Sequence, residues 1–402
     1  MCEVRLDHRP GWPKSRTLGA NRRSTSVSIH HLRAVPTRVL VISNYSDPIF
    51  PIRPEAEIFL GLLRMGFEIH VITPEHSTYA SYLKETGAHI YNYKPEGKFD
   101  LKAVRMIRQI VKKNSIQIVH AFNSKAIACS VWALLGTKTK LVTYRGYTGN
   151  IRWYDPALYL TFLSPRIDYM VCLAESVREE YLRNGVDSKR AVTINKGHNR
   201  TWYDIIPRAD LSELAIPPTS LTMSFVANKR TRMKGVIHLI EAMNKIPVGL
   251  DIFILMIGNG LKTPDVEKAL EQSAYKDRFL FTGYRQDAAE LVRASNLSIS
   301  VSLFGEATQK AMIEAMYLGN PVIISDISGN RGMVEDGIGG YIVPSGNSSA
   351  IAESLLKFIH LSIPERQEMG YRAQQHIQSF LGLDKTIGEY AAFYERITQS
   401  EQ

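Results

Sequence analysis

The chain of 402 residues has 45% hydrophobic and 22% charged residues and a formal net charge of +10. Its length suits two domains of roughly 150–200 residues each, and its composition is that of a globular protein, which excludes an intrinsically disordered chain. No apolar run approaches the roughly 18–20 residues that a membrane-spanning helix needs. Three widely spaced cysteines, Cys2, Cys129 and Cys172, offer neither a metal-ligand cluster nor a disulfide framework and indicate a reducing, cytoplasmic compartment.

Residues 1–36 are expected to form a disordered basic tail. They hold seven Lys or Arg residues against two acids, Glu3 and Asp7, a net charge of +5. A solvated leader without a partner is the simplest interpretation, and contact with anionic lipid or organelle targeting are the alternatives. No apolar run follows the charges, which argues against a secretory signal.

From Thr37 onward, short apolar runs of strand length alternate with amphipathic stretches of helix length. Continuous apolar runs are typical of parallel strands that are covered by helices on both faces. Two sets of such repeats predict an α/β protein with two doubly wound, Rossmann-like domains side by side. The predicted strands are Arg38–Asn44, Ile69–Thr73, Ile116–Phe122, Leu141–Arg145, Tyr169–Ala174, Ala191–Asn195, Met223–Asn228, Ile252–Gly258, Phe279–Gly283, Leu297–Ser302, Pro321–Asp326 and Tyr341–Pro344.

Three prolines between Asp204 and Pro218 interrupt any regular element and mark the predicted domain boundary. The first domain is therefore assigned to residues 37–205 and the second to residues 206–380. Residues 381–402 are expected to form a C-terminal helix that crosses back to the first domain, with Ile387 and Tyr390 on its apolar stripe.

In open parallel sheets, ligands bind beyond the carboxyl ends of the strands, so two such sheets predict a site in the cleft between them. The most informative strand end is Ser302, which a loop with Glu306 and a helix from about Thr308 to Leu318 follow. We expect Glu306 to lie in this loop and Glu314 to point from the helix toward the same cleft. The free backbone amides of Ala307, Thr308 and Gln309 would then form an anion site suited to a diphosphate.

The segment Phe304–Pro321, with its two glutamates and the following Glu-Ala-Met and Gly-x-Pro, resembles the signature of glycosyltransferase family 4. These are retaining enzymes with the GT-B fold, and the resemblance covers roughly residues 37–397. It implies a nucleotide-sugar donor, with Glu306 on the hydroxyls of the transferred sugar and Glu314 on the donor ribose. A carboxylate can accept such paired hydroxyl hydrogen bonds.

A second match to this family is the basic segment Val226–Gly235, where the family places an Arg and then a Lys-Gly pair that hold the diphosphate. Lys234 aligns with the lysine. Strict spacing places Lys229 at the arginine position, and we prefer the adjacent Arg230 over Arg232; a solvated basic turn is the alternative. Fixed cations would stabilise the departing diphosphate, and no Asp-x-Asp ends a predicted strand, so no metal or other cofactor is expected.

Weaker candidates follow other strands. His120 corresponds to the family's His-x-His, of which one histidine is missing here, and both a catalytic contact with the sugar and a structural role stay open. Gly258, Gly260, Tyr284 and Arg285 occupy the region where the family binds the nucleotide. The acceptor side departs further from the family pattern, and its candidates are Asn44, Arg145 and His198.

The sequence therefore predicts a retaining, metal-independent glycosyltransferase that is active on a glycan or lipid-linked acceptor in bacterial surface polysaccharide or lipopolysaccharide synthesis. It is expected to be cytoplasmic, to make peripheral contact with the inner face of the cell membrane, and to bind no nucleic acid. A nucleotide-sugar epimerase or phosphorylase of the same fold is the alternative. A nicotinamide-dependent oxidoreductase would need Gly-x-Gly-x-x-Gly after the first strand, which is missing, and a non-catalytic binding protein is the last alternative.

Overall fold

A computed structural model describes residues 36–46 and 52–399, all within one compact unit that begins at Pro36. The prediction for the tail falls almost wholly outside the described residues, as does part of the proline-rich segment after Asn44.

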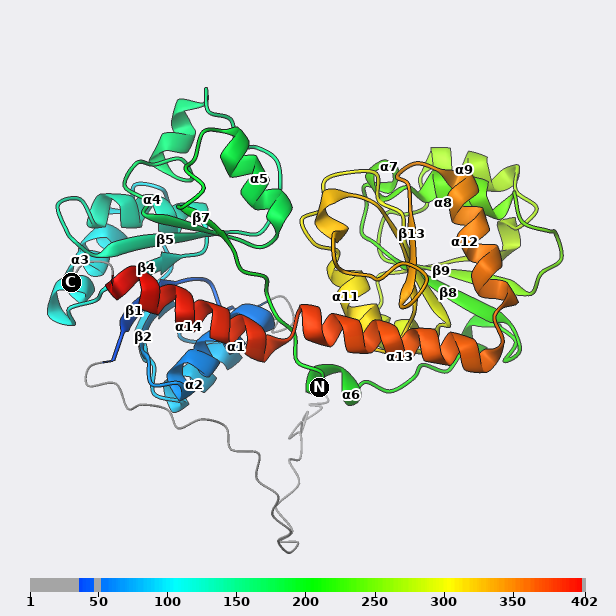
Figure 1. Ribbon diagram of the computed structural model, residues 1–402, viewed down its shortest axis with the longest axis horizontal. Helices are drawn as coiled ribbons and strands as arrows, with labels where there is room; N and C mark the ends of the chain where they lie inside the picture. Colours follow the sequence, from blue (N-terminus) through cyan, green and yellow to red (C-terminus); the bar gives the residue numbers. More distant parts are fainter. Residues whose placement is uncertain (1–35, 47–51, 400–402) are drawn as a thin grey trace, which may run out of the picture. The chain divides into compact units, whose positions relative to one another are not determined.

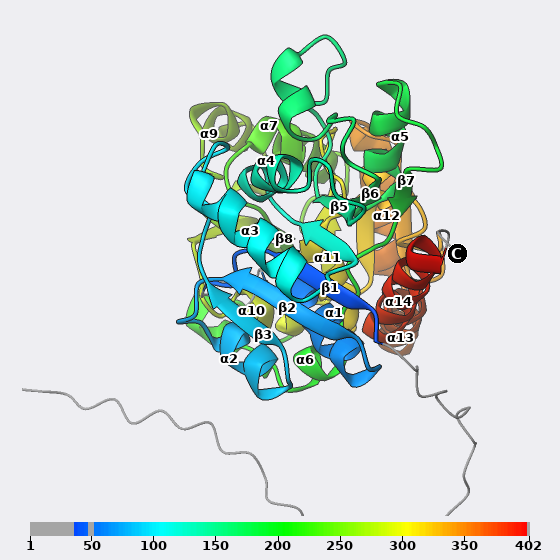
Figure 2. The same ribbon diagram turned by 90° about the vertical axis from the view of Figure 1, so that its left-hand side faces the viewer.

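The first domain contains a sheet of seven parallel strands in the order β3-β2-β1-β4-β5-β6-β7 (Figure 1 and Figure 2). Its strands are β1 (Arg38–Ile42), β2 (Glu68–Thr73), β3 (His89–Asn92), β4 (Ile118–Ala121), β5 (Lys140–Arg145), β6 (Tyr169–Cys172) and β7 (Ala191–Thr193). The helices between them are α1 (Arg53–Arg64), α2 (Thr78–Glu85), α3 (Leu101–Lys113), α4 (Ser124–Ala133), the 3-10 helix η1 (Pro156–Leu160) and α5 (Glu175–Arg183).

The second sheet has six parallel strands in the order β10-β9-β8-β11-β12-β13. These are β8 (Leu221–Val226), β9 (Ile252–Ile257), β10 (Phe279–Gly283), β11 (Leu297–Ser300), β12 (Val322–Ser325) and β13 (Gly340–Val343). The helices in and after this domain are α7 (Thr231–Lys234), α8 (Val236–Met243), α9 (Pro264–Glu271), α10 (Ala288–Ala294), α11 (Lys310–Tyr317), α12 (Ser348–His360), α13 (Ile363–Phe380) and α14 (Leu383–Gln399). Short 3-10 helices are η3 (Lys276–Arg278) and η4 (Ser328–Asn330), and the segment between β7 and β8 holds α6 (Thr201–Asp204) and η2 (Leu211–Leu214).

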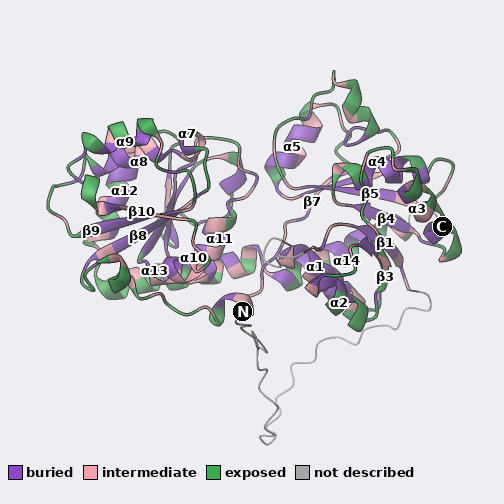
Figure 3. Ribbon diagram, turned by 180° about the vertical axis from the view of Figure 1, so that it is seen from behind, coloured by how far each residue is buried: buried purple, intermediate pink, exposed green. Residues whose placement is uncertain are grey.

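The central strands of the first sheet are largely apolar, because helices cover both faces of the sheet. In β1, Leu40 and Ile42 join the core cluster that contains Ile107 of α3, whereas Val39 and Val41 join the cluster that contains α1 and α14. The helices α3 and α4 thus lie on one face, and α1, α2 and α14 on the other (Figure 1 and Figure 2). Buried residues accordingly concentrate in the strands (Figure 3). All twelve predicted strands are present, with ends that differ by one to two residues in most cases.

The sequence analysis missed one strand, β3. Its four residues, His-Ile-Tyr-Asn, form no apolar run, because β3 pairs with β2 alone at the edge of the sheet and every residue in it is at least partly exposed. An edge strand with little burial lacks the hydrophobic pattern that identifies central strands.

The C-terminal helix α14 packs against α1 of the first domain. Ile387, Tyr390 and Tyr394 belong to the same core cluster as Phe59. The contact is close at Gly61, where an added Cβ would lie 2.3 Å from Ile387 Cδ1. None of the helices within the described residues is both long enough and apolar enough to cross a membrane.

Candidate active site

Loops at the carboxyl ends of three neighbouring strands, β8, β9 and β10, are joined by hydrogen bonds. The Lys229 amide donates to the Asn259 carbonyl at 2.7 Å, and the Asn259 amide donates to Asn228 Oδ1 at 2.9 Å. Asn259 Oδ1 in turn accepts from the Tyr284 amide at 3.1 Å. The structure therefore brings the basic segment, the Gly-Asn-Gly loop and Tyr284 together, as expected for parts of one site.

Gly258 makes this close approach possible. Its φ is +128°, and an added Cβ would lie 1.8 Å from the carbonyl oxygen of Ala227. Gly260 also has a positive φ, +67°, and faces Lys229 Cγ, which a Cβ would approach to 3.0 Å. Both glycines thus position the loop of Lys229.

The basic segment itself has an unusual backbone. Lys229 and Arg230 both have φ of 53°, in the left-handed region that residues other than glycine rarely adopt. Arg230 is the residue that precedes α7, and its side chain and that of Arg232 are exposed. Neither arginine has an ion-pair partner among the described residues, and two such cations beside the Gly-Asn-Gly loop suit an anionic ligand.

Lys234 and Glu306, predicted separately, form an ion pair. Lys234 Nζ lies 2.5 Å from Glu306 Oε1, and both side chains are more than four-fifths buried. Ser302 Oγ donates to the same carboxylate oxygen at 3.2 Å. The carbonyl of Met233 accepts from the Leu303 amide at 2.7 Å, and this bond holds the lysine segment against the glutamate loop.

Gly235 permits this contact between the two segments. Its φ is +72°, and an added Cβ would lie 2.1 Å from the Val301 carbonyl oxygen. The structure therefore explains why a glycine follows Lys234. The glycine lets the end of α7 approach the end of β11, and the lysine beside it reaches Glu306.

The helix after Glu306 begins at Lys310, two residues later than predicted. The amides of Ala307, Thr308 and Gln309 donate no hydrogen bond within the described residues, and the Gln309 carbonyl accepts from Met312 and Ile313. The Gln309 side chain is buried, and neither its Oε1 nor its Nε2 has a partner. These donors are free to bind a ligand at the start of α11, as the diphosphate prediction requires.

Glu314 lies on α11 and is only partly buried, although its neighbours Met312, Ile313 and Ala315 are fully buried. Lys310 Nζ lies 3.3 Å from its Oε1. Glu314 and Lys310 line a small pocket with Arg53, His198, Trp202 and Tyr203. The ionic partner of Glu314 is therefore a lysine one helical turn away.

The two residues expected near the nucleotide base differ in their surroundings. The Tyr284 side chain is exposed. The Arg285 guanidinium forms two hydrogen bonds with the Asp287 carboxylate, of 2.7 and 2.5 Å, which lower the pKa of that carboxyl group. Tyr284 is thus accessible to a ligand, whereas Arg285 is already engaged.

His120 lies in the core of the first domain. It is 0% exposed, and its Nδ1 lies 2.6 Å from the Tyr394 hydroxyl of α14. Burial, with a smaller contribution from Lys196, lowers its pKa to about 3, so the ring is neutral at physiological pH. The predicted catalytic contact between His120 and the sugar does not agree with this position, because α14 covers the ring, and we assign His120 a structural role.

Two of the three acceptor-side candidates are also buried. Arg145 lies with its guanidinium carbon 4.2 Å from the Tyr147 ring centroid and 4.6 Å from that of Phe162, and it donates to the Gly149 carbonyl. His198 bonds to the Tyr203 hydroxyl, and its backbone amide donates to Leu381. Both candidates therefore hold loops in place rather than present a free side chain.

Asn44, the third candidate, follows β1 and is half-buried. Its Oδ1 accepts from Ser46 Oγ at 2.7 Å. Tyr45 and Ser46 separate it from the undescribed residues 47–51, and its place after β1 is consistent with the predicted acceptor side.

Stability should fall on acidification because of two buried histidines. The pKa of His120 and that of His198 are lowered from 6.5 to about 3. The unfolded state therefore binds more protons between these values, so stability is complete above pH 6.5 and declines as the pH falls toward 3. From about pH 7 to 5, each histidine should cost about 2 kcal/mol. Urea unfolding of the wild type and of His120→Phe at both pH values measures this loss. An equal drop in the free energy of unfolding from pH 7 to pH 5 in the two proteins would contradict the prediction.

The sequence analysis missed a buried ion pair at the carboxyl ends of the first sheet. Lys196 Nζ lies 2.7 Å from Glu55 Oε2, and Ser43 Oγ donates to Glu55 Oε1 at 2.5 Å. Lys196 also lies 4.2 Å from the Tyr144 ring centroid. One signal was available, since Glu55 is an acid in the first turn of the helix that follows the first strand.

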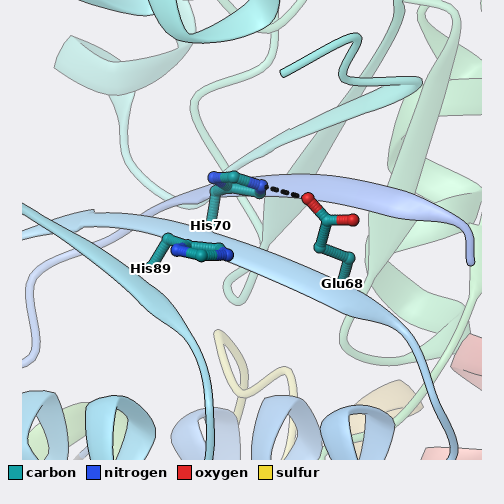
Figure 4. A group of neighbouring side chains, drawn as sticks. All are labelled: Glu68, His70 and His89. Atoms are coloured by element: carbon teal, nitrogen blue, oxygen red, sulfur yellow. Dashed lines mark hydrogen bonds and ion pairs between the residues drawn. The ribbon is translucent and has the colours of Figure 1, made fainter.

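Within the described residues, one group of His and Glu side chains is close enough to hold a metal ion. Glu68, His70 and His89 place their ligand atoms within 4.8 Å of one another (Figure 4). Both ring nitrogens of His70 already have protein partners, Glu68 at 2.9 Å and the Tyr91 hydroxyl at 3.1 Å. Glu68 and His89 begin β2 and β3, at the opposite edge of the sheet from the carboxyl ends, and we assign this group no part in the active site.

Two family profiles match the chain. The profile described as Glycosyltransferase Family 4 matches residues 56–201, and the profile described as Glycosyl transferases group 1 matches residues 209–376. Together they span both Rossmann-like domains and include the Lys234–Glu306 site.

The alignments with two curated relatives each cover about two thirds or more of the relative's length. N-acetyl-alpha-D-glucosaminyl L-malate synthase of Bacillus anthracis is 22% identical over 359 residues, which cover 86% of this chain and 93% of that protein. Phosphatidyl-myo-inositol mannosyltransferase of Mycobacterium leprae is 25% identical over 269 residues, which cover 63% of this chain and 67% of that protein.

The crystal structure of Anabaena Alr3699/HepE in complex with UDP has the same fold. It superposes with a TM-score of 0.70 at 15% sequence identity, over 89% of this chain and 100% of that chain. The two Rossmann-like domains therefore have the GT-B arrangement, as predicted.

Proposed function

The chain belongs to glycosyltransferase family 4, and on this premise we propose that it transfers a sugar from a nucleoside diphosphate donor to a glycan or lipid-linked acceptor with retention of configuration. The observation that carries the proposal is the Lys234–Glu306 pair, which lies beside the free amides of residues 307–309. A cation and free amide donors together suit the β-phosphate of such a donor.

Each group has a task that follows from its chemistry. In the proposed reaction, the bond between the sugar C1 and the phosphate oxygen breaks, and charge grows on the β-phosphate. Lys234, together with Arg230 or a neighbouring cation, stabilises that charge more in the transition state than in the bound donor. Glu306, which bonds to Lys234 in the free enzyme, then accepts hydrogen bonds from sugar hydroxyls, and Glu314 accepts them from the ribose.

Retention follows if the acceptor attacks from the face that the phosphate leaves. The acceptor oxygen forms the new bond to C1, and its proton passes to the departing phosphate oxygen, so atoms and charge balance without a protein nucleophile. His120 takes no part, since it is buried beneath α14. We propose that the reaction requires neither a metal ion nor another cofactor, because protein cations supply the charge.

The proposal extends to the acceptor and to the location of the reaction. One relative is by its name a phosphatidyl-myo-inositol mannosyltransferase, and this supports a lipid-linked acceptor here. We propose that the enzyme acts at the inner face of the cell membrane, in bacterial surface polysaccharide or lipopolysaccharide synthesis.

A donor screen tests the proposed function. Uridine diphosphate sugars are the first candidates because a structural neighbour holds UDP. A ligand at 100 times its dissociation constant should add about 2.7 kcal/mol of stability, which thermal unfolding detects. NMR of the product then reports the anomeric configuration, with and without EDTA. An inverted product would contradict retention, and a loss of activity in EDTA would contradict metal independence. A donor that is altered in the absence of acceptor would identify an epimerase.

A further inference from the structure

Helix α3 has a one-sided charge. Five of its 13 residues are basic and none is acidic: Lys102, Arg105, Arg108, Lys112 and Lys113. The longer stretch of residues 101–154 contains ten Lys or Arg residues and no Asp or Glu. Within this stretch, no acidic side chain is available to form an ion pair with the basic ones.

All five cations point away from the core. At roughly 100° per residue, they fall on one half of the helix, and Ala103, Ile107, Ile110 and Val111 fall on the other. The first group is exposed and the second is buried. Figure 2 shows α3 running across the side of the first domain that is turned toward the viewer.

These cations have no acidic partner among the residues that the structure describes. Arg108 donates to the carbonyls of Ala133 and Leu135, at 3.1 and 3.0 Å, and Lys102 Nζ lies 5.1 Å from the Tyr93 ring centroid. Like charges three or four residues apart on a helix repel one another. Repulsion among these cations therefore destabilises this face of the helix, and an anionic partner would reduce the repulsion.

Large apolar side chains are exposed around the same helix. Phe99 and Leu101 precede or begin α3 and are 62% and 66% exposed, and Trp132 and Leu135 at the end of α4 are 40% and 46% exposed. The Phe99 and Trp132 rings lie 6.2 Å apart. Exposed apolar groups that gather in one place mark an interaction site more often than scattered ones do.

A basic hollow adjoins the C-terminal half of the helix. The cavity measures about 620 Å³, and its lining includes Arg108, Lys112, Lys138 and Lys140 but no acidic residue. This chemistry fits a phosphate group.

We propose that the α3 surface, made of the five cations and the four apolar side chains, binds a phospholipid bilayer that contains anionic lipids, with lipid phosphates in the basic hollow. A soluble polyanion would need the cations alone. The apolar groups favour a bilayer, since aromatic and aliphatic side chains enter the headgroup region while Lys and Arg bind the phosphates. The surface lies outside the donor site, and the proposal does not depend on the reaction proposed above.

Vesicle co-sedimentation of the full chain tests the surface. Vesicles of equal parts phosphatidylcholine and phosphatidylglycerol should bind the wild type, and pure phosphatidylcholine should bind it at least tenfold more weakly. Arg105→Glu/Lys112→Glu should lower binding to the anionic vesicles by tenfold or more, since each basic residue near such a surface contributes severalfold. Lys268→Glu/Lys357→Glu changes the net charge equally on the exposed faces of α9 and α12 and should bind as the wild type does.

The apolar groups are tested separately. Phe99→Ser/Trp132→Ser should weaken vesicle binding severalfold and leave a remainder that high salt abolishes. The midpoint of thermal unfolding should be close to that of the wild type in all three variants, which shows that they are folded. Unchanged vesicle binding by the α3 charge-reversal variant would overturn the proposal, and so would binding to soluble polyphosphate without binding to vesicles.

Discussion

Lys234→Ala is expected to lower kcat/KM for the sugar donor by about 10²–10³-fold, as the loss of one fixed donor to a developing charge does in other active sites. Lys234 is the residue that the family pattern assigns to the diphosphate, and in the structure its ion pair with Glu306 spans 2.5 Å. Its loss should lower kcat as well as donor affinity, since the charge on the leaving phosphate is largest in the transition state.

Lys234→Ala needs a control variant, because the substitution also leaves Glu306 without its cation in a largely buried position. Lys234→Met/Glu306→Gln removes both charges and should recover the thermal stability of the wild type while it remains inactive. Initial rates of nucleotide release, measured with saturating acceptor, would report both variants. Near-normal kcat/KM in Lys234→Ala would remove this lysine from the site.

Glu55→Ala is expected to lower the free energy of unfolding by about 3–5 kcal/mol, because it leaves the Lys196 ammonium buried without its counter-ion. Only 8% of Glu55 is exposed, and both of its carboxylate oxygens have partners, Lys196 and Ser43. The Tyr144 ring beneath Lys196 offsets part of the loss through a cation–π contact.

A matched double variant separates the charge from the packing. Glu55→Leu/Lys196→Met replaces the pair by apolar groups of similar size and should regain most of the lost stability. Guanidinium unfolding of both variants, followed by circular dichroism, gives the comparison. A loss below about 1 kcal/mol in Glu55→Ala would mean that water reaches the lysine as it does at a surface ion pair.

The sequence predicted the fold well because central parallel strands have a recognisable hydrophobic pattern. Each is apolar at consecutive positions, since two layers of helices cover it, and β9 is buried at all six residues. The edge strand β3 has no such pattern and was missed. The family resemblance is confirmed by the two profiles, of which the one over residues 209–376 contains Phe304–Pro321, and the GT-B fold is confirmed as well.

The site was predictable in its parts but not in its contacts. Lys234 and Glu306 follow β8 and β11, which are neighbours in the sheet, and strand order is not visible in a hydrophobic pattern. His120 lies in β4 and Arg145 is the last residue of β5, near the carboxyl ends of their strands, yet whether they face a ligand depends on distant residues. His120 is covered by Tyr394, 274 positions later, and Glu55 finds Lys196 141 positions later.

The return of α14 to the first domain has a consequence for biosynthesis. Tyr390 and Tyr394 complete the core that Phe59 and the strands of the first sheet begin, yet the ribosome makes them after the entire second domain. The first domain therefore emerges with an open apolar face and cannot finish folding in the usual order, N-terminal domain first. Its completion waits for the last helix, so the nascent chain holds an unsealed core for as long as synthesis of residues 194–382 takes.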